Sequence, residues 1–165
     1  YKENEFDVIL SQYGHMFAPR PAVVVKELAR VLKPGGILAF STWPKELFMG
    51  KFFKLIESFS QPLPPEVASP VLWGDMAIIE DRLKDHFDHI EFARDTMFAP
   101  TMSPAHMLKL FEKNAGPLAN LVKALADDPT KLSNLRNAAL VLIEKFFSNN
   151  FLRQDFLMTR CVKKT

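Results

Sequence analysis

A short loop after the first apolar run of the chain holds the residues best suited to chemistry. The run Phe6–Ser11 has little alternation and reads as a strand covered on both faces, and the loop continues to Phe17. Ligands of open α/β sheets bind at the carboxyl ends of the strands, so this loop is a candidate binding site. His15 can accept a proton near neutral pH and is the candidate catalytic residue. The alternatives are an ordinary connecting loop and a histidine that is packed or faces solvent.

A tryptophan is expected at the same edge of the sheet. Trp43 ends a second apolar run, Ile37–Trp43, where its ring could stack on a substrate or equally belong to the core. A group further along has the residue types of a metal site: Asp85, His86, Asp88 and His89. These residues precede a third expected strand and therefore belong at the opposite end of the sheet, so no metal site is predicted.

A strand, a helix and a strand within the first 43 residues would position both candidates. Pro21 suits the first position of a helix, and apolar residues recur at helical spacing from Val24 to Leu32. The segment Lys33-Pro34-Gly35-Gly36 is expected to end that helix. The two strands should then be parallel and joined by a right-handed crossover.

The rest of the chain continues the alternation of helices and strands. Prolines at 62, 64, 65 and 70 argue against regular structure over residues 61–72, and proline opens each of three helices between residues 103 and 150. The other expected elements are helices over 46–60 and 76–86 and strands over 89–98 and 156–162. The predicted class is α/β.

Composition excludes several classes of protein. Apolar residues make up 48% of the 165 and charged residues 24%, which excludes a disordered chain. No apolar run reaches the ~18–20 residues of a membrane helix, and a net charge of +2 gives no argument for nucleic acid. The single cysteine, Cys161, is expected to be a buried inert thiol, and a cytoplasmic location is the default.

The ordered phrase "FDVIL…ELARVLKPGG…AFSTW" resembles one family strongly. It is similar to the class I S-adenosylmethionine-dependent methyltransferases, in the small-molecule branch that includes quinone-biosynthesis enzymes. The resemblance implies a Rossmann-like sheet. In chain order, the four expected strands would be the family's fourth, fifth, sixth and seventh. That seventh strand would be antiparallel and lie between the fifth and sixth.

The family's first three strands and its glycine-rich cofactor turn have no counterpart in the sequence. Its only adjacent glycines are Gly35 and Gly36. The resemblance therefore implies residues 1–165 as a single incomplete methyltransferase domain, the C-terminal part of such an enzyme. S-adenosylmethionine would be the cofactor of the full-length protein, and this chain alone is not expected to bind it.

The resemblance also implies roles for individual residues. The cofactor would lie beside the loop after the first strand, at Ser11, Gln12, Tyr13 and Gly14. The stretches 44–72 and 103–150 would be lid-like helical insertions over a lipophilic or aromatic acceptor, although plain helix packing is the alternative. The candidate substrate-binding residues are Phe17, Trp43, Phe48, Phe52, Met107 and Phe111.

The function expected for the full-length protein is methyl transfer to a small, lipophilic acceptor. The alternative is a non-catalytic truncated paralogue that serves as an oligomerisation or interaction module. Because the family's fourth strand normally pairs with its first, the first strand of this chain would have a bare apolar edge, which predicts a homodimer or higher oligomer.

Overall fold

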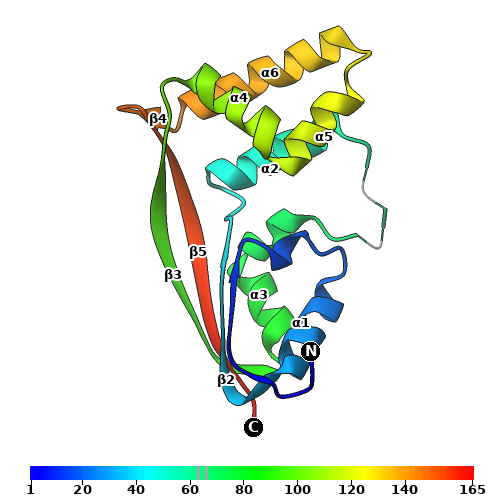
Figure 1. The fold of residues 1–165 in the computed structure, drawn as a ribbon, viewed down its shortest axis with the longest axis vertical. Coiled ribbons are helices and arrows are strands. Elements are labelled where there is room, and N and C mark those ends of the chain that lie inside the picture. The colour runs from blue at the N-terminus through cyan, green and yellow to red at the C-terminus, as the bar shows by residue number, and fades with distance from the viewer. Residues whose placement is uncertain (63, 66) are drawn as a thin grey trace. The chain divides into compact units, whose positions relative to one another are not determined.

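The computed structural model describes residues 1–62, 64–65 and 67–165, and these form two compact units. Unit 1 comprises Tyr1–Lys45, Leu63–Asp95 and Phe156–Thr165, and unit 2 comprises Glu46–Pro62 and Thr96–Asp155. Two long strands run through both units (Figure 1). No helix among the described residues is long and apolar enough to cross a membrane.

Unit 1 is built on a mixed sheet. β1 (Phe6–Gln12) pairs in parallel with β2 (Leu32–Thr42), and α1 (Pro21–Val31) connects them. β5 (Phe151–Lys163) pairs antiparallel with the other side of β2, and β3 (Phe87–Pro100) lies beyond it, giving the order β1-β2-β5-β3. The predicted α/β class is confirmed, and the last strand lies between β2 and β3 as the resemblance implied.

The Lys-Pro-Gly-Gly segment acts differently from the prediction. α1 already ends at Val31, and the segment is part of β2 rather than a separate helix stop. Phe6 pairs with Leu32 and Val8 with Ile37, so the residues between bulge out of the ladder. Gly35 has a φ of 74°, a left-handed conformation that glycine adopts without a steric cost.

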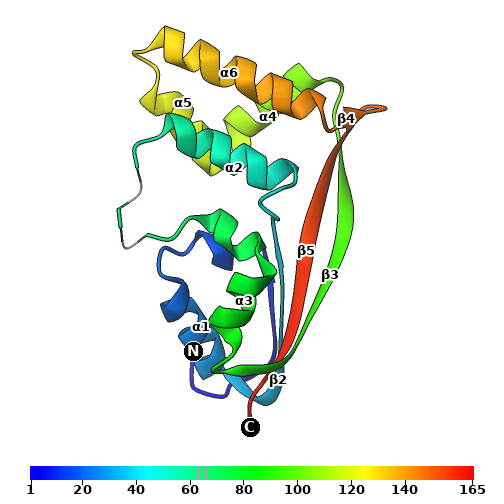
Figure 2. The same cartoon turned by 180° about the vertical axis from the view of Figure 1, so that it is seen from behind.

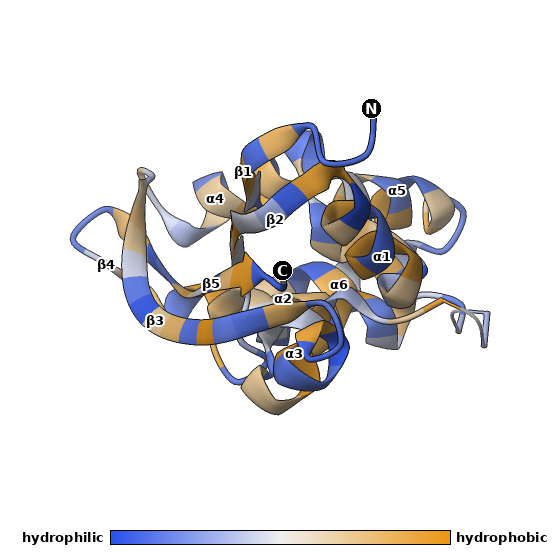
Figure 3. Ribbon diagram, turned by 90° about the horizontal axis from the view of Figure 1, so that it is seen from below, coloured by the Kyte–Doolittle hydropathy of each residue, from blue (hydrophilic) through white to orange (hydrophobic). Residues whose placement is uncertain are grey.

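Helices cover one face of this sheet (Figure 1). α1 buries Val25 and Ala29, and α3 (Met76–Leu83) buries Ile79 and Leu83. Asp75 caps α3 by accepting a hydrogen bond from the backbone N–H of Ala77. Apolar and polar stretches alternate around α1, as its helical spacing predicted (Figure 3).

Two short 3-10 helices complete unit 1. η1 (His15–Phe17) follows β1, and η2 (Pro70–Gly74) precedes α3. The expectation of no regular structure over 61–72 is therefore wrong at its end, because Pro70 is at the start of η2, where proline is tolerated. Within that stretch Leu63 and Glu66 lie outside the described residues.

Unit 2 is mainly helical (Figure 2). Its helices are α2 (Phe48–Phe59), α4 (Pro104–Asn114), α5 (Gly116–Ala124) and α6 (Pro129–Glu144). Each of the last three has proline in its first turn, and Ser103 and Asp128 cap α4 and α6. The domain prediction, with 44–72 and 103–150 as a substrate cover, stays a prediction.

The strands are longer than the sequence predicted. β3 spans Phe87–Pro100 rather than 89–98, and β5 spans Phe151–Lys163 rather than 156–162. A short strand, β4 (Phe147–Ser148), pairs with the start of β5 through a turn in which Asn149 and Asn150 both have positive φ. Such turns favour asparagine and match the twist of a hairpin, so the asparagine pair turns the chain into β5.

Candidate functional site

The loop after β1 leaves the sheet through a strained residue. Gln12 is the last residue of β1 and pairs with Ser41. Tyr13 then has a φ of 58°, which is uncommon for a residue with a side chain, and its backbone N–H donates to the carbonyl oxygen of Ser41 at 3.2 Å. This left-handed residue fixes the direction in which the next side chains point.

Aromatic stacking holds Tyr13 against the end of β2. Its ring lies parallel to that of Trp43, with centroids 3.9 Å apart and planes at 5°, and Phe156 contacts it edge-on at 6.4 Å. Burial raises the pKa of Tyr13, while a side-chain hydrogen bond with Ser41 acts in the opposite direction. Trp43 is only 5% exposed, so Tyr13 and the core already occupy most of its surface.

His15 points into unit 1. Its backbone N–H donates to Ser11 Oγ at 3.2 Å, and the same oxygen lies 3.0 Å from its Nδ1. The imidazole contacts the rings of Phe40 and Trp73 edge-on, at 4.4 and 4.6 Å between centroids. Burial, together with the positive charge of Arg82, lowers the pKa of His15 to about 4. The ring is therefore neutral at pH 7 and a weak base.

The remaining loop residues face outward. Gln12, Gly14 and Phe17 are exposed, with Phe17 at 47%. Gly14 has an ordinary φ of −78°, and a Cβ there would meet only Ser11 Oγ, at 3.6 Å. The loop thus presents an amide, a bare backbone and an aromatic ring at the carboxyl edge of β1, while Met16 is buried beneath it.

The other predicted substrate residues belong to unit 2. Phe48, Phe52 and Met107 are at most 4% exposed and lie in its helical core, and Phe111 is partly buried against them. The rings of Phe52 and Phe111 are 5.0 Å apart. These contacts are those of a packed core, and a substrate role for the four side chains stays a prediction.

Two residues near the loop were not anticipated from the sequence. Trp73 in η2 is 1% exposed, and the guanidinium carbon of Arg82 in α3 lies 4.5 Å from its ring centroid. Both follow the proline-rich stretch, and no spacing relates them to the loop. Only the tertiary fold brings them beneath His15.

No other cluster of candidate ligands is present among residues 1–62, 64–65 and 67–165. In that part of the chain no group of three His, Cys, Asp or Glu residues could hold a metal ion. Cys161 is fully buried, and burial raises its pKa to about 12, so its thiol is protonated as expected for an inert cysteine.

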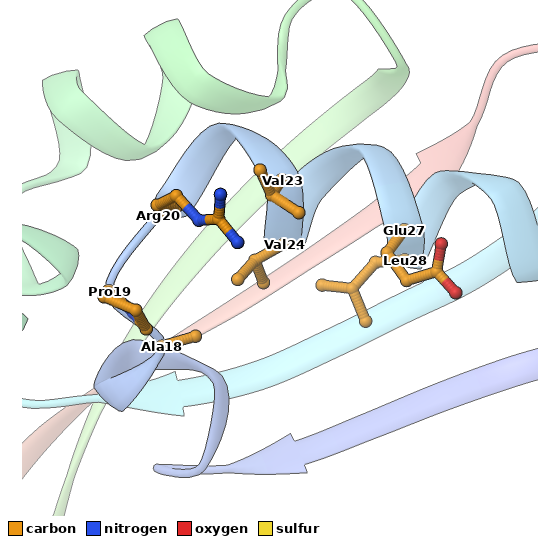
Figure 4. A pocket seen from close by; sticks show the side chains of 7 residues that line it. All are labelled: Ala18, Pro19, Arg20, Val23, Val24, Glu27 and Leu28. Atoms are coloured by element: carbon orange, nitrogen blue, oxygen red, sulfur yellow. The ribbon is translucent and has the colours of Figure 1, made fainter. Parts of the chain in front are cut away.

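An outward hollow lies beside the loop, on the free side of α1 (Figure 4). It has a volume of about 340 Å³, and Val24 and Leu28 form its apolar floor between Arg20 and Glu27. Val24 and Leu28, two of the apolar residues that recur at helical spacing in α1, are only partly buried.

Comparisons with known proteins find similar folds. Residues 1–40, which include β1, the loop, α1 and most of β2, match the family model of a methyltransferase domain. The whole fold matches a SAM-dependent methyltransferase from Thermotoga maritima, with a TM-score of 0.51, 17% identity and coverage of 99% of this chain and 58% of that one. The chain has a class I methyltransferase fold. A Haemonchus contortus phosphoethanolamine N-methyltransferase gives the same TM-score at 16% identity, covering 100% of this chain and 35% of that one.

Relatives of this methyltransferase-fold chain occur in mycobacteria. The uncharacterized protein Rv1403c of Mycobacterium tuberculosis is 28% identical over 159 residues, covering 96% of this chain and 58% of its own length. A second, Rv1405c, is 24% identical over 165 residues, covering 99% of this chain and 60% of its own length. The chain therefore spans about three fifths of the curated relatives that it matches.

Proposed function

We propose that the protein to which this chain belongs transfers a methyl group from S-adenosylmethionine to a small, lipophilic acceptor. The observation that carries the proposal is the segment Ser11–Phe17, which runs from the last two residues of β1 through η1 at the carboxyl edge of the sheet, within the matched residues 1–40. Open α/β sheets bind ligands at this edge. The methyl group would come from the sulfonium of the bound cofactor.

The exposed part of the loop fits one portion of that cofactor. Gln12 and Gly14 are open to solvent, so an amide side chain and an unobstructed backbone can approach an amino-acid moiety. Ser11 and Tyr13 act less directly, because Ser11 Oγ accepts a hydrogen bond from the backbone N–H of His15 and the Tyr13 ring stacks on Trp43. They hold the loop in the shape that displays Gln12. The glycine-rich cofactor turn of the family does not occur in the sequence of 165 residues.

His15 serves as a positioning residue in this proposal. A pKa of about 4 and contacts with two buried rings make it a poor proton acceptor at neutral pH. Transfer from an activated sulfonium depends mainly on the placement of the two reactants, so a rigid loop serves the reaction without a base in it. Phe17, exposed on the same loop, is the side chain best placed to meet an apolar acceptor.

Isothermal titration calorimetry on the 165-residue chain tests the cofactor part of the proposal. Because Ser11–Gly14 would form only a portion of the site, we expect no measurable heat with S-adenosylhomocysteine. Micromolar binding to the chain would contradict that expectation.

A methyl-transfer assay on the longer gene product tests the function itself. Gln12→Ala should weaken cofactor binding by roughly tenfold, the cost of about one charge-assisted hydrogen bond. Glu112→Gln in unit 2 is the matched control and should leave binding unchanged. A gene product that begins close to Tyr1 and shows no transfer activity would favour the non-catalytic interaction module instead.

A further inference from the structure

Five buried side-chain polar atoms lack a hydrogen-bond partner in the described part of the chain. They are His15 Nε2, Thr42 Oγ1, Trp73 Nε1, Arg82 Nη1 and Thr159 Oγ1. Buried polar groups are nearly always hydrogen-bonded, and each exception needs a reason. Three of the five belong to side chains in contact, because Trp73 lies against both His15 and Arg82, and these three indicate a common cause.

Phe40 in β2 lies beside this group. The rings of His15 and Trp73 contact it at 4.4 and 5.8 Å between centroids. Thr159 is its cross-strand partner on β5, and Thr42 follows two residues later on the same face of β2. Arg82 completes the group through its contact with the Trp73 ring. Every member belongs to unit 1.

The nitrogen atoms of the group require acceptors. The indole N–H of Trp73 and the Nη1 of Arg82 can only donate. Ser11 Oγ accepts from the backbone N–H of His15, which leaves its own proton free to be donated to Nδ1. In that arrangement His15 Nε2 carries the ring proton and is a third donor.

The charge of the group is also unbalanced. Burial lowers the pKa of Arg82, no carboxylate among the described residues opposes that shift, and the positive charge of Arg82 disfavours protonation of His15. A cation that is half removed from water without a counter-ion loses solvation free energy that an anion would restore. The rings are in van der Waals contact, so any anion must be compact.

We propose that unit 1 binds a small monovalent anion of about the size of chloride among His15, Trp73 and Arg82. The anion accepts hydrogen bonds from the three nitrogen donors and neutralises Arg82. The anion links η1, η2 and α3, and so stabilises the inward-facing part of the loop that follows β1. The inference stands on unit 1 alone and does not depend on the methyltransferase activity.

The chloride NMR line width of the 165-residue chain tests this directly. Chloride exchanging with a protein site gives a broadened line, and we expect broadening with the wild type that is lost in Arg82→Gln. Arg136→Gln, which removes an exposed arginine paired with Glu112 in unit 2, is the control and should retain it. Equal line widths for wild type and Arg82→Gln would overturn the proposal and leave ordered water as the partner of these atoms.

Thermal unfolding supplies a second readout. A ligand that binds only the folded state raises the midpoint with its concentration. Replacing sodium gluconate by sodium chloride at constant ionic strength should raise the midpoint of the wild type and of Arg136→Gln, but not that of Arg82→Gln. Trp73→Phe, which removes only the indole donor, should reduce the effect. If circular dichroism shows that Trp73→Phe is unfolded, the comparison of Arg82→Gln with Arg136→Gln still tests the proposal. The same midpoint in both salts for the wild type would contradict an anion site.

Discussion

The inward orientation of His15 gives the chain a specific dependence on pH. The pKa of His15 is lowered from 6.5 to about 4 in the folded state, so between these values the unfolded state binds more protons than the folded state. The free energy of unfolding therefore falls as pH falls from 6.5 to 4, by up to ~3 kcal/mol. Below about pH 4 this contribution is fully lost.

His15→Gln should remove that part of the slope, whereas His86→Gln, an exposed histidine at the end of α3, should retain it. Urea unfolding at pH 4.5 and 6.5 in chloride-free buffer measures the difference. If wild type and His15→Gln lose the same stability on acidification, His15 is not held neutral by burial.

The candidate site could be predicted in part at this scale. The position of the loop follows from the apolar strand before it, and the edge position of Trp43 follows from its place at the end of a run. The direction of each side chain does not, because it depends on the left-handed backbone of Tyr13. Nor could Trp73 and Arg82 be found, since only tertiary packing brings them to His15.

Among the elements, the helix starts were predictable because local chemistry fixes them. Asp75, Ser103 and Asp128 each accept a backbone N–H from the first turn of the following helix, as residues of their type commonly do. The start of β5 was missed because Phe151 and Leu152 are followed by three polar residues, Arg153 to Asp155. Asp155 is buried there only because Thr96 and Arg153 donate hydrogen bonds to it, and both partners depend on the fold.

The contact between η2 and the end of β2 is the tightest junction between elements around the site. A Cβ on Gly74 would overlap the backbone carbonyl of Trp43 and the Cα of Pro44. Gly74→Ala must therefore separate η2 from the end of β2, and we expect a loss of ~2–4 kcal/mol in the free energy of unfolding.

Gly116→Ala is the matched control, because a Cβ at the first residue of α5 would meet no atom within 4 Å. It should change stability by less than about 1 kcal/mol. Denaturant unfolding followed by tryptophan fluorescence compares the two. Similar stabilities for both variants would show that the junction can relax.

At the scale of the whole molecule, the free side of β1 is the feature with the largest consequence. β1 ends the strand order, so its backbone groups on one side have no neighbouring strand among the described residues. Val8 is 50% exposed and Leu10 76%, and the apolar hollow lined by Phe6, Ile9 and Leu28 runs beside them. An exposed apolar edge of this kind pairs readily with another strand.

We propose that the 165-residue chain forms a dimer or higher oligomer by pairing β1 of one copy with β1 of another. An antiparallel pairing centred on Ile9 would place Val8 opposite Leu10 of the second copy and bring no like charges together.

Leu10→Lys puts a charge on this edge and should shift the chain to monomer, because edge lysines oppose pairing. Val141→Lys, at a residue 53% exposed on α6, is the control and should leave the assembly intact. Light scattering across a range of concentrations measures all three proteins. A wild type that stays monomeric at the highest concentration rules out pairing at this edge, and an oligomer that survives Leu10→Lys must use another surface.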